Sequence, residues 1–403
     1  MKSQFFEYII AGAGLAGVSA VQAIREQDPL GSILLVGAEN RLPYNRPPLT
    51  KGLWSGKKKF EDIFVQSSVW FEKNGVELRL GTAISAVSPV TREVFLQEGG
   101  ALSYGKLLLS TGGSPRRLSL PGEEDEFIFY YRYVSDYERL RPLVKPGVRV
   151  AVIGGGFIGS ELAASLSLQG AQVTIIMPQQ YLCSRVFPDE LARAVTGEYT
   201  NRGIYIMAHD SVQSFHREGE QIVIETGSGL LRSDLVVAGL GIEPETELAG
   251  QAGLRVEKGI WVDEYLRTSD PDIYAAGDNA FFPYQALQKR VRVEHWDNAM
   301  YQGYTAGRNM AGGEEVYSHM PYFFSDLFDF GYEAVGDVNS ANSTVSDWRE
   351  QNVEGVIYYL NGLNQIVGVM CCGIYGKMDQ ARDVIRRRVT LDPAAKEFPI
   401  SGD

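Results

Sequence analysis

Four short apolar runs along the chain predict β-strands, and they fall into two pairs with the same layout. The first pair spans residues 5–11 and 33–36, and the second spans residues 148–153 and 173–176. In each pair a glycine-rich turn follows the first run, a stretch typical of a helix follows the turn, and the second run comes next. Strand, turn, helix and strand in this order predict parallel strands joined by a crossover helix. The chain is therefore expected to be an α/β protein with doubly wound sheets.

The two turns carry the same fingerprint, G-x-G-x-x-G. The first fingerprint contains Gly12, Gly14, Leu15, Ala16 and Gly17, and the second contains Gly154, Gly156, Phe157, Ile158 and Gly159. The first glycine makes the tight turn, the second lets the backbone approach a pyrophosphate, and the third lets the helix pack on the strand. One fingerprint is a weak signal, but here the whole strand–turn–helix–strand context occurs twice. The sequence predicts two Rossmann-like dinucleotide sites, each with its phosphates at a helix N-terminus.

The residue that follows each second strand distinguishes the two predicted nucleotides. Glu39 lies about 20 residues after Gly17, where a carboxylate can accept a hydrogen bond from a ribose 2′-hydroxyl. Gln179 is its counterpart in the second unit, and neither Arg nor Lys occurs between Met177 and Ser184. No cation in this stretch can pair with a 2′-phosphate, so the second site is expected to favour NADH, with NADPH possible. The alternative for Glu39 is a solvated loop charge.

Two dinucleotides in one chain suggest that a hydride passes between nicotinamide and flavin. Three further segments support a flavin. They are the strand end Ser110-Thr111-Gly112-Gly113, the strand end Gly277-Asp278, and Glu294-His295-Trp296 a short distance beyond.

With these motifs the chain resembles the FAD-dependent pyridine-nucleotide oxidoreductases, and among them the ferredoxin and rubredoxin reductases and apoptosis-inducing factor. The resemblance covers nearly the whole sequence. It implies a glutathione-reductase-like arrangement of two Rossmann-like domains plus a small α+β C-terminal domain. The implied boundaries are 1–115 and 248–318 for a discontinuous FAD-binding domain, 116–247 for an NAD(P)H-binding domain, and 319–403 for an interface domain.

The same resemblance implies which residues bind the cofactors. FAD would contact Gly12, Gly14, Leu15, Ala16, Gly17, Glu39, Arg46, Lys51, Thr111, Gly112, Gly277, Asp278, Glu294, His295 and Trp296. The nicotinamide nucleotide would contact Gly154, Gly156, Phe157, Ile158, Gly159, Gln179 and Gly241. Lys51 and Glu161 are the implied catalytic residues, with the lysine close to the flavin and the glutamate paired with it. A lysine and a helix N-terminus would stabilise the negative charge of a reduced flavin. Simpler alternatives are an exposed loop position for Lys51 and a packed imidazole for His295.

The cysteines exclude one branch of this chemistry. Cys183, Cys371 and Cys372 form neither a CxxC nor a CxxxxC pair, and none lies near residues 44–51. A disulfide reductase needs a redox dithiol against its flavin, so that mechanism is not expected. The four histidines are scattered, so no metal site is expected either. Few cysteines without a disulfide pattern fit a reducing, cytoplasmic compartment.

Charge narrows the expected partners. The net charge is −12 with an isoelectric point near 5.0, which disfavours nucleic acid. The same charge limits long-range attraction to an acidic ferredoxin unless basic residues cluster locally. Candidate clusters are 57–59, 116–117 and 386–388, and the alternative for each is a solvated surface. No apolar run of about 18 residues free of glycine and charge occurs, so no membrane span is predicted.

Two positions depart from the family pattern. Phe324 stands where the reductases often have Trp, and Cys372 stands where apoptosis-inducing factor would have Trp. The expected function is hydride transfer from NADH to FAD, followed by electron transfer to a small iron–sulfur or rubredoxin-type carrier. Two alternatives stay open: an NADH-sensing protein like apoptosis-inducing factor, with a long-lived reduced complex, and an NADH:quinone reductase. The chain is expected to be a monomer or a homodimer.

Overall fold

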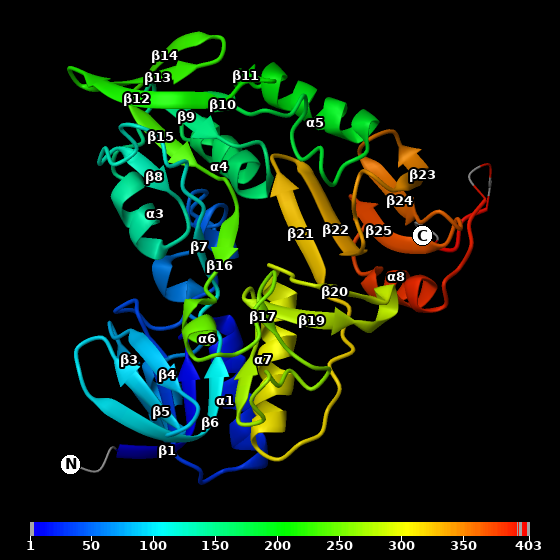
Figure 1. Cartoon of the computed structure of the whole chain (residues 1–403). Coiled ribbons are helices and arrows are strands. Elements are labelled where there is room, and N and C mark those ends of the chain that lie inside the picture. The colour runs from blue at the N-terminus through cyan, green and yellow to red at the C-terminus, as the bar shows by residue number, and fades with distance from the viewer. Residues whose placement is uncertain (1–3, 393, 395–396, 401–403) are drawn as a thin grey trace. The chain divides into compact units, whose positions relative to one another are not determined.

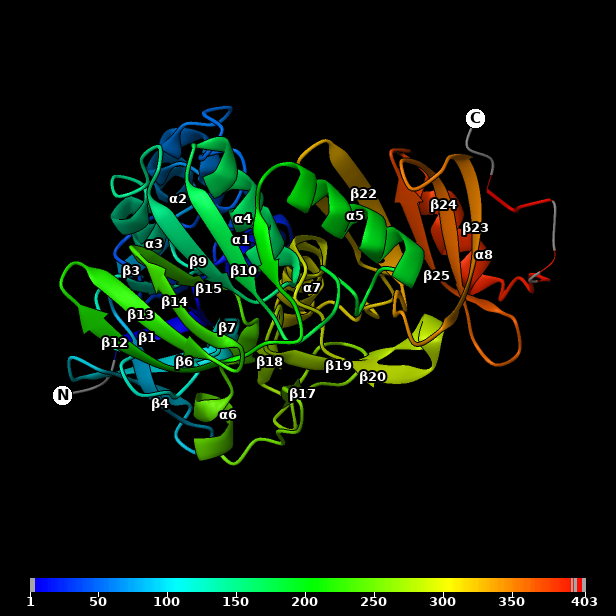
Figure 2. The same cartoon turned by 90° about the horizontal axis from the view of Figure 1, so that it is seen from above.

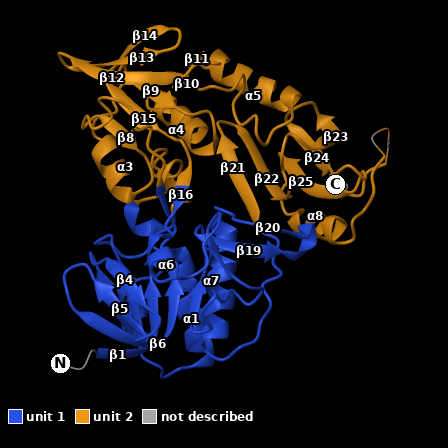
Figure 3. Cartoon of the chain, in the orientation of Figure 1, with its two compact units in different colours: residues 1–45, 60–114, 243–321 blue, residues 46–59, 115–242, 322–403 orange. Residues whose placement is uncertain are grey.

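The structure is a computed structural model, and it describes residues 4–392, 394 and 397–400. The chain forms two compact units (Figure 3). Unit 1 contains residues 1–45, 60–114 and 243–321, and unit 2 contains residues 46–59, 115–242 and 322–403. Each unit is discontinuous in sequence because the chain leaves it and returns. The finer division into three domains stays a prediction.

Unit 1 is built on a seven-stranded sheet in the order β3-β2-β1-β6-β5-β4, with β18 also paired to β6. Its parallel strands are β1 (Gln4–Ala11), β2 (Ile33–Gly37), β3 (Val76–Leu80), β6 (Ala101–Leu109) and β18 (Ile273–Ala275). The antiparallel strands are β4 (Ile84–Ser88) and β5 (Glu93–Leu96). All of β2 is buried, which explains its continuous apolar sequence.

Helix α1 (Leu15–Gln27) and helix α7 (Trp296–Met310) pack against each other in unit 1 (Figure 1). Their backbones approach closely because α7 carries glycines at the contact. A Cβ on Gly303 would overlap the backbone of Ala16, and a Cβ on Gly307 would overlap that of Ala20. The other elements of unit 1 are α2 (Ser68–Lys73), α6 (Glu247–Gln251), β17 (Ile260–Trp261), β19 (Ala280–Tyr284) and β20 (Lys289–Val291).

Unit 2 contains a second parallel sheet, in the order β11-β10-β9-β15-β8. Its strands are β8 (Ile128–Tyr130), β9 (Arg149–Ile153), β10 (Gln172–Ile176), β11 (Tyr205–Met207) and β15 (Leu235–Ala238). Its helices are α3 (Val134–Leu140), α4 (Phe157–Leu168) and α5 (Asp189–Asn201). A separate antiparallel sheet consists of β12 (Val212–Glu218), β13 (Gln221–Thr226) and β14 (Gly229–Ser233).

The C-terminal part of unit 2 is an antiparallel sheet in the order β21-β22-β25-β24-β23. Its strands are β21 (Tyr322–Leu327), β22 (Phe330–Gly336), β23 (Ser343–Glu350), β24 (Glu354–Leu360) and β25 (Ile366–Cys372). Helix α8 (Met378–Arg386) packs on β22 and β25 (Figure 2). Strands β7 (Gly113–Pro115) and β16 (Ile242–Pro244) lie where the chain passes between the units.

The α/β fold predicted from the sequence is confirmed. Each of the four predicted apolar runs is a strand, β1, β2, β9 and β10, whose bounds differ from the prediction by one residue. The predicted helices after the two glycine turns are α1 and α4. In the part of the chain that the structure describes, no helix combines the length and apolar character needed to cross a membrane.

Candidate functional site

The three glycines of the first fingerprint serve three different purposes between β1 and α1. Gly12 has a φ of +120°, and a Cβ there would overlap the carbonyl oxygen of Ser110. A Cβ on Gly17 would overlap the carbonyl oxygen of Gly12, so the third glycine lets α1 close onto the turn. A Cβ on Gly14, by contrast, would meet no atom within 4 Å. This second glycine therefore faces open space at the N-terminus of α1, where a phosphate can reach the helix N–H groups.

The second fingerprint repeats this division in unit 2. Gly154 has a φ of +107°, and a Cβ there would lie 2.6 Å from the carbonyl oxygen of Gly239. A Cβ on Gly159 would overlap the carbonyl oxygen of Gly154, whereas one on Gly156 would meet nothing within 4 Å. Gly156 is also the N-cap of α4. Both turns thus fit a dinucleotide pyrophosphate, each within its own unit.

Around the first turn, two residues that the sequence analysis missed connect the predicted flavin segments. The amide of Asn279 donates to the hydroxyl of Thr111 at 3.0 Å, and the N–H of Gly277 donates to Oε1 of Gln302 at 2.8 Å. Among the described residues, Oδ1 of Asn279 and Nε2 of Gln302 are buried without a hydrogen-bond partner. Such atoms are rare in folded proteins, and a polar cofactor would supply partners for them. Asn279 directly follows the Gly277-Asp278 motif, which was the available signal.

Glu39 and the N-terminus of α7 lie in the same unit. Oε2 of Glu39 accepts a hydrogen bond of 2.7 Å from the Tyr44 hydroxyl.

His295 is the N-cap of α7, and burial lowers its pKa to about 4 although nearby carboxylates oppose this shift. Its imidazole is therefore neutral at neutral pH. The indole N–H of Trp296 donates to Asn45 at 2.7 Å, and the neighbouring Glu294 pairs with a guanidinium.

A contact between a histidine and an aspartate is another unpredicted feature, at the start of α7. Nε2 of His319 lies 2.6 Å from Oδ2 of Asp297, and the ring of Tyr301 stacks on the imidazole with a centroid distance of 3.7 Å. Asp297 belongs to the first turn of α7, where a carboxylate is stabilised by the helix dipole. A histidine and an aspartate 22 positions apart carry no local signature, so no sequence pattern indicates this pair.

The remaining predicted nicotinamide contacts all lie in unit 2. Gln179 follows β10, and its carbonyl accepts from the N–H of His209 at 3.3 Å. Gly241 has a φ of +83° and its carbonyl accepts from the N–H of Arg116 at 3.0 Å. At the start of α4, Ile158 is exposed and the Phe157 ring lies 5.5 Å from that of Phe323.

Lys51 and Glu161, the two predicted catalytic residues, form an ion pair in unit 2. Nζ of Lys51 lies 3.0 Å from Oε1 of Glu161, and the glutamate is 6 % exposed. Glu161 belongs to α4, one turn after the glycine turn, while Lys51 belongs to the segment 46–59. That segment is fixed to α4 because Ser165 donates to the carbonyl of Thr50 at 2.6 Å. Packing within unit 2 therefore places the ammonium group of Lys51 against the buried carboxylate of Glu161.

Arg46, at the start of the same segment, is held differently from Lys51. Its guanidinium donates to the carbonyl of Arg132 at 2.9 Å and lies 5.2 Å from the centroid of the Tyr133 ring. Its predicted contact with FAD stays a prediction.

The three cysteines are free and buried. Burial raises the pKa of the Cys183 and Cys371 thiols to about 12, and it raises the pKa of Cys372 as well. A thiol with a raised pKa is a poor nucleophile at neutral pH. In the described residues no group of His, Cys, Asp and Glu side chains is arranged to hold a metal ion.

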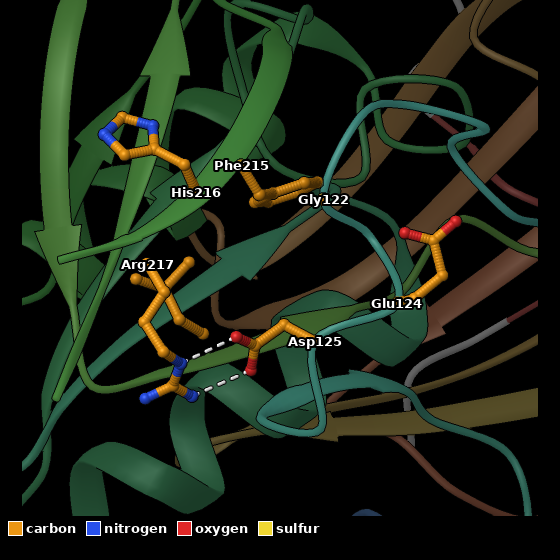
Figure 4. A pocket seen from close by; sticks show the side chains of 7 residues that line it. Gly122, Glu124, Asp125, Phe215, His216 and Arg217 are labelled. Carbon is orange, nitrogen blue, oxygen red and sulfur yellow. Dashed lines mark hydrogen bonds and ion pairs between the residues drawn. The ribbon is translucent and has the colours of Figure 1, made fainter. Parts of the chain in front are cut away.

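A small open pocket in unit 2 lies outside these predicted sites (Figure 4). Its lining residues are Gly122, Glu124, Asp125, Phe215, His216, Arg217 and Ile222. Figure 4 shows Arg217 directed at Asp125, and the two form hydrogen bonds of 2.8 and 2.9 Å. An ion pair thus lines the pocket, and none of the predicted nucleotide contacts does.

Comparison with known proteins gives consistent family matches. A profile described as "Pyridine nucleotide-disulphide oxidoreductase" matches residues 6–303, and one described as "Apoptosis-inducing factor, mitochondrion-associated, C-term" matches residues 306–354. The chain is 34% identical over 423 residues to "Apoptosis-inducing factor 1, mitochondrial" of Dictyostelium discoideum, covering 96% of this chain and 79% of the relative.

Ferredoxin reductase components are also among the relatives. The chain is 32% identical over 396 residues to "Anthranilate 1,2-dioxygenase system ferredoxin--NAD(+) reductase component" of Burkholderia cepacia, covering 98% of each chain. Among solved structures, "Crystal structure of the covalent putidaredoxin reductase-putidaredoxin complex" superposes with a TM-score of 0.90 at 29% identity, covering 96% of this chain and 94% of that chain.

Proposed function

Because this chain belongs to the pyridine nucleotide-disulphide oxidoreductase family, we propose that it is an FAD-dependent NADH reductase whose electron acceptor is a small iron–sulfur or rubredoxin-type protein. The observation that carries the proposal is the pair of glycine turns, each with its middle glycine open at a helix N-terminus. FAD, when bound, accepts a hydride and releases electrons singly, which connects a two-electron donor to a one-electron carrier.

The residues of each unit have separate tasks in this proposal. In unit 1, the turn around Gly14 would hold the FAD phosphates and Glu39 would hold a ribose hydroxyl. In unit 2, the turn around Gly156 would hold the phosphates of NADH, and Gln179 would lie beside its ribose. The free polar atoms of Asn279 and Gln302 support a polar ligand in unit 1.

Lys51 supplies positive charge, and Glu161 fixes where that charge lies. A preorganised cation stabilises negative charge that develops during reduction, and it does so more strongly where water is excluded. The Lys51 side chain is 18% exposed and Glu161 is 7% exposed, so the pair is largely shielded from water. The N-terminus of α7, with neutral His295 as its N-cap, would add helix-dipole stabilisation in unit 1.

A second function has specific support from the C-terminal part of the chain. Residues 306–354 match the C-terminal profile of apoptosis-inducing factor, and a relative of that name is 34% identical to this chain. An NADH-sensing flavoprotein would use the same residues as a reductase. It would differ in rate, because its reduced complex with NAD⁺ would persist instead of passing electrons on.

Anaerobic stopped-flow spectroscopy separates these functions. The purified protein is reduced with NADH and then mixed separately with a ferredoxin, a rubredoxin, a quinone and oxygen. Rapid reoxidation by an iron–sulfur or rubredoxin-type protein is the expected result. A reduced complex that persists with every acceptor would favour the sensing function, and selective reoxidation by the quinone would favour a quinone reductase. A protein that neither contains nor binds FAD would refute all three.

Two lysine variants test the site itself in that experiment. Lys51→Ala should slow flavin reduction by about 10²–10³-fold while FAD stays bound, because one preorganised charge is lost. Lys57→Ala is the matched control, since Lys57 is an exposed lysine of the same segment. Equal rates for the two variants would show that Lys51 has no role in hydride transfer.

We also propose a cytoplasmic location. All three thiols are free and buried, and no disulfide joins the adjacent Cys371 and Cys372. Reduced thiols are typical of compartments that glutathione and thioredoxin keep reducing. Cell fractionation, combined with a reagent that labels free thiols, would test this location.

A further inference from the structure

The carboxylate of Glu161 accepts hydrogen bonds from three side chains. The hydroxyl of Thr50 donates to Oε2 at 2.5 Å, and the ammonium of Lys51 lies 3.0 Å from Oε1. The third donor is the hydroxyl of Ser325, which reaches the same Oε1 from strand β21. In both hydroxyl contacts the hydroxyl donates and the carboxylate oxygen accepts, and the Thr50 hydroxyl also lies 3.3 Å from the carbonyl of Pro47. Ser325 lies 164 positions away in the sequence, and the sequence predicts no role for it.

The neighbours of Ser325 on β21 contact the lysine instead of the glutamate. Nζ of Lys51 lies 4.9 Å from the centroid of the Phe324 ring and 3.9 Å from Oδ2 of Asp326. Ser325 is 2% exposed, whereas Phe324 is 40% exposed. Three consecutive residues of one strand thus touch the ion pair, and only the buried one touches Glu161.

We propose that Ser325 is a positioning residue, whose hydroxyl fixes Oε1 of Glu161 and thereby fixes the ammonium of Lys51. The carboxylate is fixed at Oε2 by Thr50 and at Oε1 by Ser325. Without Ser325 the carboxylate is free to pivot about the Thr50 hydrogen bond, and Lys51 can turn toward Asp326, whose carboxylate already lies 3.9 Å away. The proposal rests on the proposed function only in the measurements that use the flavin to detect where the charge of Lys51 lies.

A purely structural role for Ser325 makes a different prediction. Removing a buried hydroxyl that donates to a carboxylate would lower the stability of the folded chain, and nothing else would change. A positioning role requires that Lys51 itself behaves differently. The test therefore needs measurements that follow Lys51 directly and not the fold alone.

The experiment compares Ser325→Ala with Ser325→Thr, which keeps a hydroxyl and suits a strand. Ser325→Cys provides a second perturbation of similar size with a weak donor, should the alanine variant fold poorly. Ser346→Ala removes an exposed serine from β23 of the same sheet and is the matched control. Asp326→Asn tests the alternative partner of Lys51.

The first measurement does not depend on bound cofactor. Each variant is treated briefly with an amine-acetylating reagent, and acetylation of Lys51 is quantified by mass spectrometry against that of the exposed Lys57. We expect Lys51 in Ser325→Ala to react several-fold faster than in the wild type, and Ser325→Thr to react at the wild-type rate. An unchanged Lys51 reaction rate in both Ser325→Ala and Ser325→Cys would overturn the proposal, whatever the protein catalyses.

The second measurement uses the FAD-loaded protein. The rate of flavin reduction at saturating NADH should fall about tenfold in Ser325→Ala, the cost of one hydrogen bond to a charged group, without a change in the NADH concentration at half-saturation. The flavin midpoint potential should become more negative, and Ser325→Thr should restore both values. Changed acetylation with an unchanged potential would place Lys51 away from the flavin, which would contradict the proposed role of Lys51 and leave Ser325 as its positioning residue.

Discussion

Alanine substitutions in the second fingerprint separate nucleotide binding from folding. Gly156 has φ −84° and ψ −171°, which alanine adopts readily, and an added Cβ would meet no atom within 4 Å. Gly156→Ala should therefore change the free energy of unfolding by no more than about 1 kcal/mol. The added methyl group, however, occupies the open space where a pyrophosphate would approach the helix. Loss of one or two charge-assisted hydrogen bonds there would weaken NADH binding by about 10–100-fold.

Gly159→Ala is the contrasting variant. The added Cβ would overlap the backbone carbonyl oxygen of Gly154. Unlike the end of a flexible side chain, this backbone oxygen cannot move aside easily. Helix α4 would have to shift from β9, at a cost of about 1–3 kcal/mol or more. Urea unfolding and NADH titration by fluorescence measure the two effects independently. Wild-type NADH affinity in a folded Gly156→Ala protein would refute the assignment of this turn to a dinucleotide.

Three further predictions concern specificity, pH and the thiols. Gln179→Glu should sharpen the preference for NADH at least tenfold in kcat/KM, because a carboxylate repels a 2′-phosphate; a shift toward NADPH would contradict this placement. His295 has a pKa of about 4 in the folded chain and about 6.5 when unfolded, so only the unfolded state takes up its proton in this range. Stability should thus fall by roughly 3 kcal/mol as the pH drops from 6.5 to 4, and His295→Gln should lose less in urea unfolding at the two pH values. Replacing Cys183, Cys371 and Cys372 by Ser should leave NADH-dependent reduction of a ferredoxin or a quinone dye intact; loss of turnover in a folded, FAD-loaded variant would mean that a thiol carries electrons.

The features that could be predicted from the sequence have local causes. At Gly12 the chain needs a positive φ and a close backbone approach. Both requirements favour glycine over other residues, so both can be recognised from the sequence. Burial on both faces leaves continuous apolar runs, as in β2. These local signals were sufficient for the α/β fold and the two glycine turns, and the fold is confirmed by the structural relatives.

The features that the sequence did not reveal depend on tertiary packing. Thr50 and Ser325 are ordinary polar residues in sequence, and only the folded chain brings them to the two oxygens of Glu161. The unpartnered amide atoms of Asn279 and Gln302 also could not be predicted, because a buried amide is recognised only after its neighbours are known, although Asn279 adjoins the Gly277-Asp278 motif. The pairing of Lys51 with Glu161 was available only through resemblance to a family, since no spacing rule connects these positions.

The structure also shows the surroundings of the two residues that depart from the family pattern. Phe324 is 40% exposed and its ring faces the ammonium of Lys51, so an aromatic residue is retained where a cation–π contact exists. Cys372 is fully buried in β25, so a small, non-aromatic side chain occupies this position. Whether these residues replace shielding tryptophans stays a prediction.

The way in which electrons leave this protein follows from what its thiols can do. Many flavoproteins deliver a pair of electrons to a dithiol, which requires a thiolate that can attack. Here burial raises the pKa of every cysteine, and Cys183 packs against the hydroxyl of Ser160 at 3.7 Å inside unit 2. Cys371 and Cys372 occupy consecutive strand positions, whose side chains point to opposite faces. Since no cysteine is prepared for two-electron exchange, delivery to a redox dithiol of this chain is not expected, and a one-electron carrier or a quinone is left as the acceptor. Whether electrons pass quickly to an acceptor or the reduced complex persists is then a question of the reoxidation rate, which the stopped-flow experiment measures.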